Sequence, residues 1–249
     1  MLFHIAPGSD GFGPLYGRIA TLMRQRIRDG LWRTGEQLPT LEELADEFDA
    51  SRVTLRQALD LLERDGLIER HRGRGTFVTE AAAGFQWITL GRSWQGLLES
   101  IDGTRPKLLN SADVAVPPGM AGSSGLAPSY RRLERVHSRH GVPFAAMRLH
   151  VDRRRYDLAP HRFDIEPVIP LLAELPGPRI ALGRQILTVG GAEPEVAAHL
   201  ELPLGAPVGI LRRVITDETG CAIYVGDLVY RGDTIRMQVD LDIPREPAA

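Results

Sequence analysis

Between residues 40 and 65, apolar and polar positions alternate with the period of two short amphipathic helices. The first apolar stripe is Leu41, Leu44, Ala45 and Phe48, and the second is Leu55, Ala58, Leu59 and Leu62. Thr40 can cap the first helix, and Glu43 three residues later can close a capping box. Ser51 is placed to cap the second helix, and Asp49 suits a left-handed turn between them. This pattern predicts a helix-turn-helix.

The segment that follows predicts a basic hairpin. Residues 67–70 and 76–78 have the composition of two short strands. They are joined by the sequence His-Arg-Gly-Arg-Gly at 71–75, which is both positively charged and rich in glycine. Such a hairpin is typical of the wing of a winged helix.

The polar side of the second helix carries side chains suited to reading base edges. A recognition helix contacts bases with its N-terminal residues, where the helix dipole also favours phosphate. We therefore expect contacts with double-stranded DNA from Thr40, Ser51, Arg52, Thr54, Arg56, Gln57, Arg72, Gly73 and Arg74. The alternative is an ordinary solvated helix face, which the ordered succession of helix, turn, helix and wing disfavours.

Residues 14–78 resemble the winged-helix domain of GntR-family bacterial transcription regulators. The matching elements are PLY, GxxLPT, ELA, SRxTxRQAL, LxxxGLI and RGxGTFV. Two positions depart from the family pattern. Glu42 stands where an Arg often helps to contact DNA, and Asp49 replaces the usual turn Gly. We expect the fold to survive both changes and the operator preference to shift.

Composition indicates a cytoplasmic protein without a membrane anchor. The chain has 249 residues, one cysteine (Cys221) and no apolar run near the ~20 residues needed to cross a bilayer. In the first 80 residues acidic side chains slightly outnumber arginines, but the arginines gather in the first helix, the recognition helix and the wing. One DNA-binding domain should therefore have only modest affinity for one operator half-site. This favours a homodimer that binds a palindromic operator.

Beyond residue 86 the pattern changes to β-rich runs separated by Gly, Pro and Asp turns. Strands are expected at 87–90, 108–116, 129–138, 142–152, 180–189, 208–216, 222–230 and 234–242. Helices are expected at 94–100, 167–175 and 194–200. The fold class is α+β: a winged helix followed by a mixed antiparallel-sheet domain. The expected divisions are a flexible arm (1–13), the DNA-binding domain (14–79), a linker (80–86) and a second domain (87–245).

The second domain resembles the UTRA effector-binding domain of HutC-type GntR regulators, whose fold is shared with chorismate lyase. The residues that match the family pattern are 133–137, 141–143, 192–195, 205–208 and 230–233. The resemblance implies a dimeric repressor released by a small molecule. It also implies an anion site at a helix start after the linker, helped by two basic residues on a strand. The corresponding positions are Leu90, Gly91, Ser93, Arg135 and His137.

Four further positions imply what kind of anion binds. Met147, Tyr224 and Ile169 stand where relatives that bind phosphorylated amino sugars have hydroxyl-binding groups. A sugar would leave buried hydroxyls unpaired, at about 1–3 kcal/mol each. Tyr230 can close the pocket through its ring or hydroxyl. We expect a carboxylate with an apolar or aromatic body and few hydroxyls.

Other functions find less support in the sequence. The spacing of His137, His140 and His150 matches no familiar metal site, and no cofactor motif is present. For the triple arginine at 153–155 there are two interpretations, a second patch for DNA or a partner and a solvated turn, of which the turn is favoured. A DNA-tethered enzyme of lyase-like fold acting on a small carboxylate remains the alternative function, although no paired-carboxylate or Ser/His/Asp spacing supports it. A DNA-bending architectural protein would show little sequence preference and bind no ligand.

Overall fold

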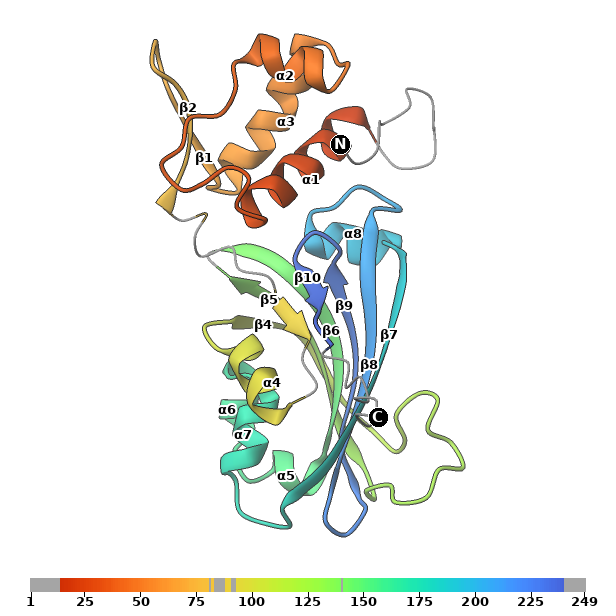
Figure 1. Ribbon diagram of the computed structural model, residues 1–249. Helices are drawn as coiled ribbons and strands as arrows, with labels where there is room; N and C mark the ends of the chain where they lie inside the picture. Colours follow the sequence, from red (N-terminus) through yellow and green to blue (C-terminus); the bar gives the residue numbers. More distant parts are fainter. Residues whose placement is uncertain (1–13, 81, 83–87, 91–92, 140, 240–249) are drawn as a thin grey trace, which may run out of the picture.

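The computed structural model describes residues 14–80, 82, 88–90, 93–139 and 141–239, which form two units (Figure 1). The expected arm at 1–13 and most of the expected linker at 80–86 lie outside the described residues. Each unit has its own hydrophobic core, one centred on residues 19–82 and the other on residues 88–235. The described residues of the two units therefore pack around different hydrophobic cores.

The N-terminal unit is a winged helix. Its elements are α1 (Leu15–Arg28), α2 (Leu41–Glu47), α3 (Arg52–Arg64), β1 (Ile68–His71) and β2 (Gly75–Val78). The capping box of Thr40 and Glu43 is confirmed, and the Ser51 side chain accepts a hydrogen bond from the Thr54 amide. Asp49 has a φ of 47°, the left-handed conformation expected for the turn between α2 and α3. The local sequence signals therefore set the geometry of the recognition helix.

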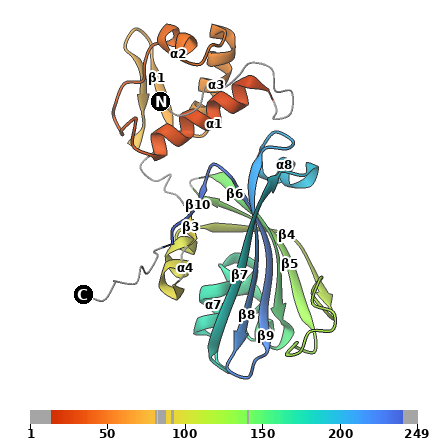
Figure 2. The ribbon, with the colours of Figure 1, turned by 45° about the vertical axis from the view of Figure 1, so that its right-hand side comes forward.

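The second unit is built on one six-stranded antiparallel sheet with the order β4-β5-β6-β9-β8-β7. The strands are β4 (Arg105–Val114), β5 (Tyr130–Arg139), β6 (Val142–Asp152), β7 (Ile180–Gly191), β8 (Pro207–Asp217) and β9 (Ala222–Arg231). Helices α4 (Trp94–Ile101), α5 (Arg153–Tyr156), α6 (Pro160–Ile165) and α7 (Val168–Glu174) lie on one face of this sheet (Figures 1 and 2). Helix α8 (Pro194–Leu200) lies at the end nearest the winged helix.

Two parts of this unit differ from the sequence prediction. The last expected strand shrinks to β10 (Ile235–Met237), which pairs in parallel with β3 (Ile88–Leu90) outside the main sheet. The triple arginine is helix α5 rather than a solvated turn. Its Arg155 is buried and donates hydrogen bonds to the carbonyls of Pro176 and Pro178. Charge alone suggested exposure there, whereas the tertiary fold supplies main-chain acceptors.

The two units meet along α1. Arg24 and Arg28 on α1 approach Asp233 in the turn after β9, at 3.8 and 4.0 Å. Asp233 also receives two 3.0 Å hydrogen bonds from Arg231, and Arg24 has a second partner, Asp65, at 2.6 Å. One buried carboxylate is therefore shared between the DNA-binding unit and the sheet.

Candidate DNA interface and effector site

The recognition helix α3 presents its expected DNA-binding residues to solvent. Arg52, Arg56 and Gln57 are exposed, whereas Leu55, Ala58, Leu59 and Leu62 are buried against the core. Thr54 is half-buried and its hydroxyl lies 2.8 Å from that of Ser51. The exposed donors therefore cluster at the N-terminal end of α3, the end that meets base edges in a recognition helix.

Glu42 affects the interface in a way that the sequence did not show. Its carboxylate lies 3.2 Å from the guanidinium of Arg52, with both side chains more than half exposed. The family's Arg at position 42 would repel Arg52, whereas Glu42 pairs with it. Arg56 has no ion-pair partner in the described part of the chain.

The wing is held in place by backbone geometry and one side chain. Gly73 and Gly75 have φ of 75° and 107°, a region that residues with a Cβ rarely adopt. A Cβ on Gly75 would also lie 2.3 Å from Nε2 of Gln37, whose amide donates to the carbonyl of Arg74 at 3.1 Å. Arg72 and Arg74 are exposed at the tip. The hairpin therefore presents two cations on a fixed turn.

Three of the four arginines of α1 are engaged in contacts within the protein and do not join this surface as the sequence suggested. Arg24 and Arg28 point into the contact with Asp233, and burial lowers the pKa of Arg28 to about 10. Arg26 pairs with Glu47 and stacks over Phe48, with its guanidinium 4.9 Å from the ring centre. The positive charge available to DNA therefore comes mainly from α3 and the wing.

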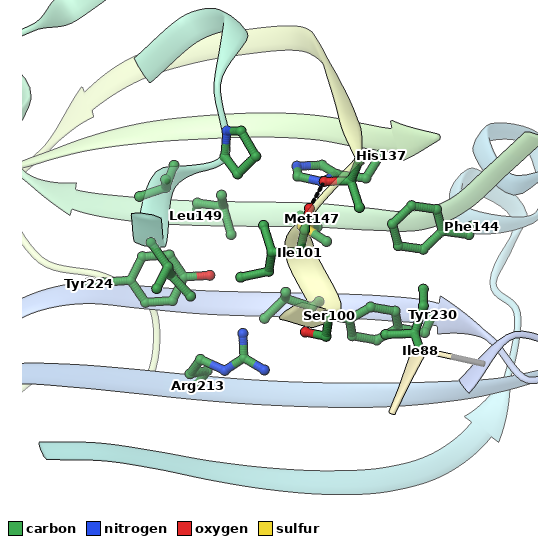
Figure 3. Close-up of a pocket in the computed structure, with 15 residues that line it drawn as sticks. Ile88, Ser100, Ile101, His137, Phe144, Met147, Leu149, Arg213, Tyr224 and Tyr230 are labelled. Carbon is green, nitrogen blue, oxygen red and sulfur yellow. Dashed lines mark hydrogen bonds between the residues drawn. The ribbon is translucent and has the colours of Figure 1, made fainter. Parts of the chain in front are cut away.

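A small cavity lies on the helix-covered face of the sheet (Figure 3). It brings together five of the expected effector residues: His137, Met147, Ile169, Tyr224 and Tyr230. They come from β5, β6, α7 and β9. The C-terminal part of α4 also lines the cavity. Its volume is about 30 Å³, which holds water but not an organic ligand.

The remaining expected effector residues lie outside this cavity. Leu90 is in the hydrophobic core, Ser93 caps α4, and Gly91 lies outside the described residues. Arg135 shares the sheet face of His137 and is 1 % exposed. Its Nη1 donates to the Glu166 carbonyl at 2.9 Å, but Nε and Nη2 have no partner in the described chain. Burial lowers the pKa of Arg135 to about 10, so it remains a cation at neutral pH.

The charge states of the cavity differ from residue to residue. Burial, reinforced by the nearby charge of Arg135, lowers the pKa of His137 to about 3, so this imidazole is neutral. Its ring meets Phe144 edge-on at 6.3 Å. Burial raises the pKa of Tyr224, whose hydroxyl lies in the electrostatic field of both Arg135 and Arg213. The sequence pair Arg135 and His137 therefore supplies one cation rather than two.

The structure adds Arg213, which the sequence analysis did not select. This residue of β8 is 3 % exposed and reaches the cavity between Tyr224 and Tyr230 (Figure 3). Its guanidinium donates to Oε1 of Gln185 at 3.1 and 3.3 Å. Arg212 and Arg213 are neighbours on β8. Strand alternation would have placed one of them on the inner face, but nothing in the sequence showed which one.

Comparison with known proteins fixes the family. Residues 15–78 match the model described as bacterial regulatory proteins, gntR family, and residues 103–236 match the UTRA domain. The HTH-type transcriptional repressor PhnF of Mycolicibacterium smegmatis is 33 % identical over 84 % of this chain and 85 % of its own. The repressor NagR of Bacillus subtilis is 28 % identical, over 88 % of this chain and 91 % of its own.

This chain belongs to the GntR family. The PhnF crystal structure superposes with a TM-score of 0.58 at 25 % identity, covering 90 % of this chain and all of that one. A winged helix followed by a UTRA domain is the HutC-type combination, as the sequence predicted. This GntR protein is a ligand-responsive, DNA-binding transcription regulator of the repressor class and not an enzyme.

Two further findings concern the described residues alone. They hold no group of three or more His, Cys, Asp or Glu arranged to bind a metal ion. No helix that they form is long and apolar enough to cross a membrane.

Proposed function

We propose that this regulator is a homodimeric repressor that binds a palindromic operator and is released by a small organic anion, a carboxylate. Its working parts would be a DNA-binding domain at 14–79, a linker at 80–86 and an effector domain at 87–245, acting in the cytoplasm where the chromosome is. The observation that carries the ligand class is Arg135, a buried cation with two donor groups left unpaired in the described chain. A buried charge of this kind is costly unless a ligand pairs with it.

DNA recognition in this proposal uses both exposed surfaces of the winged helix. Arg52 and Arg56 enter a major groove, where arginine pairs bidentately with guanine. Arg72 and Arg74 of the wing reach the adjacent minor groove, whose negative potential attracts arginine. The exposure of all four side chains supports this orientation.

Dimerisation is proposed through the free edge of the sheet at β7. An edge strand presents unpaired main-chain groups that need cover. Leu182, Ile186 and Val189 on this strand are 58, 61 and 78 % exposed. Apolar side chains gathered on one edge mark an interaction site. Ile186→Asp should therefore convert the dimer to a monomer in sedimentation velocity, whereas Thr188→Asp on the same strand should perturb it less.

The ligand proposal follows from the lining of the cavity. Met147, Ile169 and Leu149 are apolar and would leave the hydroxyls of a sugar unpaired. Arg213 lines the cavity, and both Arg213 and Arg135 act electrostatically on the Tyr224 hydroxyl, so positive charge is available there. A carboxylate with an apolar body fits both features, and α4 or α7 must move for it to enter because the cavity is small.

A thermal-shift screen tests the proposal directly. Aromatic and branched carboxylates are compared with amino-sugar phosphates on the full chain, since a ligand at 100 times its Kd stabilises by about 2.7 kcal/mol. Operator titrations with and without the best carboxylate follow, and we expect weaker DNA binding by about 1–3 kcal/mol. Preferential stabilisation by a sugar phosphate would contradict the ligand class. Unchanged operator affinity at saturating carboxylate would contradict release.

A further inference from the structure

A second, larger hollow adjoins the cavity. This groove, of about 690 Å³, lies between α4, the segment after α7, and strands β7 and β8. Its volume falls in the range of pockets that hold drug-sized ligands. Arg213 lines both the groove and the cavity, so the two spaces share one wall.

The charges of the groove are of one sign. Arg179, Arg184 and Arg213 line it, together with the polar side chains of Ser93 and Gln185. No Asp or Glu occurs among the described lining residues. The rest of the lining is largely apolar: Leu97, Leu172, Leu175, Ile180, Ile215 and Met237. Such a surface suits a molecule with an acidic end and an apolar body.

Arg213 differs from two of the other buried arginines of this chain, Arg24 and Arg231. Arg24 and Arg231 each lie within 4.0 Å of an aspartate, whereas Arg213 has no carboxylate within that distance in the described chain. Its contacts are neutral: Gln185 on β7 and the hydroxyl of Tyr230 on β9. A desolvated guanidinium with neutral partners keeps its capacity for a charge-assisted, bidentate bond.

Strand β9 has a glycine directly opposite Arg213, and the Tyr224 hydroxyl lies over it. Arg213 pairs in register with Gly226 of β9. A Cβ on Gly226 would lie 2.5 Å from the hydroxyl of Tyr224, so this hydroxyl occupies the gap that the glycine provides. Tyr224 therefore lies beside the guanidinium, and both face the cavity (Figure 3).

We infer that Arg213 is an anion-binding residue of the effector site and that the groove beneath α4 holds the body of an extended organic acid. The inference rests on the proposed effector function of this domain and names where the ligand lies. The groove supplies the room that the cavity lacks, and Arg213 at their junction binds the acidic group. The ligand class is an extended aromatic or acyl carboxylate rather than a compact sugar phosphate.

Calorimetric titration of the full chain tests this inference. The probes are 4-phenylbutyrate, 1-naphthoate and decanoate, each beside its neutral amide. We expect at least one acid to bind the wild-type protein, with its amide about tenfold weaker or worse, because a hydrogen bond to a charged group contributes about 1.5–3 kcal/mol. Arg213→Gln should weaken that acid by about tenfold or more.

Two further variants test the parts of the inference separately. One changes an arginine on the opposite face of the sheet, and the other fills the groove. Arg212→Gln changes the neighbouring arginine, which points to the opposite face and pairs with Asp227 at 2.9 Å, and should leave acid binding unchanged. Gly183→Trp fills the groove, where a Cβ at this position meets nothing within 4 Å, and should abolish binding without touching Arg213.

Four results would overturn the inference. The first two concern the wild-type protein: binding of none of the acids, or equal binding of an acid and its amide. The other two are full acid binding in Gly183→Trp and undiminished acid binding in Arg213→Gln. If acids bind through Arg213 but operator affinity does not change, this inference stands and the proposed release mechanism fails.

Discussion

The carboxylate of Asp233 lies 3.8 Å from the guanidinium of Arg24, and this pair joins the effector domain to the first helix of the DNA-binding domain. Asp233 is three residues beyond Tyr230, which lines the cavity. Arg231 between them donates two hydrogen bonds to the same carboxylate. A ligand that displaces Tyr230 would therefore act on a turn that contacts α1, which gives a short physical route between the two sites.

Asp233→Asn should strongly destabilise the protein. The substitution keeps the shape of the side chain but leaves Arg24, Arg28 and Arg231 without their shared buried anion. Breaking a buried ion pair from one side costs about 3–5 kcal/mol. Urea unfolding measures the loss. Asp227→Asn, which removes a half-exposed partner of Arg212, is the control and should cost less than about 1 kcal/mol. Equal losses in both variants would contradict a special role for Asp233.

The same contact should be insensitive to pH near neutrality. The surrounding arginines hold the pKa of Asp233 well below its usual range despite its burial. Its contribution to stability is therefore complete above the ordinary aspartate pKa of about 3.9 and is lost only as the pH falls through the lower folded value. The stability difference between wild type and Asp233→Asn should stay constant from about pH 5 to pH 8. A difference that shrinks within this range would contradict the assignment.

His137 should make the effector domain sensitive to mild acid. Its pKa is lowered from 6.5 to about 3 by burial and by Arg135, so the unfolded chain binds the proton first. Stability is complete above pH 6.5 and falls as the pH drops toward 3, by about 2 kcal/mol between pH 6.5 and pH 5. Denaturant unfolding at these two pH values should show a smaller difference for His137→Gln. Some difference remains in the variant because burial also lowers the pKa of His150.

Arg52→Ala and Arg56→Ala should each cost about 1–3 kcal/mol of specific operator affinity. Both side chains are exposed at the N-terminal end of α3. Arg64→Ala is a matched control, because Arg64 is exposed at the far end of the same helix. Footprinting titrations measure the three variants. Wild-type protection by both Arg52→Ala and Arg56→Ala would show that α3 is not the recognition helix.

Glu42→Gln should raise the affinity for every duplex. It should also lower the ratio of operator affinity to the affinity for unrelated DNA. The change removes a negative charge beside the phosphate backbone and releases Arg52 from its 3.2 Å ion pair. A freed Arg52 samples more rotamers and reads its base less selectively. Fluorescence anisotropy with operator and unrelated duplexes gives the ratio. If this ratio of operator affinity to unrelated-duplex affinity rises in the variant, the ion pair with Glu42 keeps Arg52 from contacting DNA and does not orient it.

The winged helix was accessible from the sequence because its signals are local. A cap and its partner lie three residues apart, as at Thr40 and Glu43, and Asp49 makes its turn without help from distant parts of the chain. The approximate positions of the large strands and the antiparallel class of their sheet also followed from alternation and turn residues. The short helices α5 and α6 did not, because tertiary contacts such as those of Arg155 with two distant carbonyls hold such segments.

The sequence by itself determined the family, the helix-turn-helix with its wing, and which strand carries Arg135 and His137. Only the tertiary structure decided that Arg135 is buried, that His137 is neutral, that Arg213 rather than Arg212 faces the cavity, and that α1 is bound to Asp233. The physical reason is range. Caps and turns depend on neighbours in the chain, whereas burial, charge state and the pairing of ions depend on residues brought together from opposite ends of the sequence.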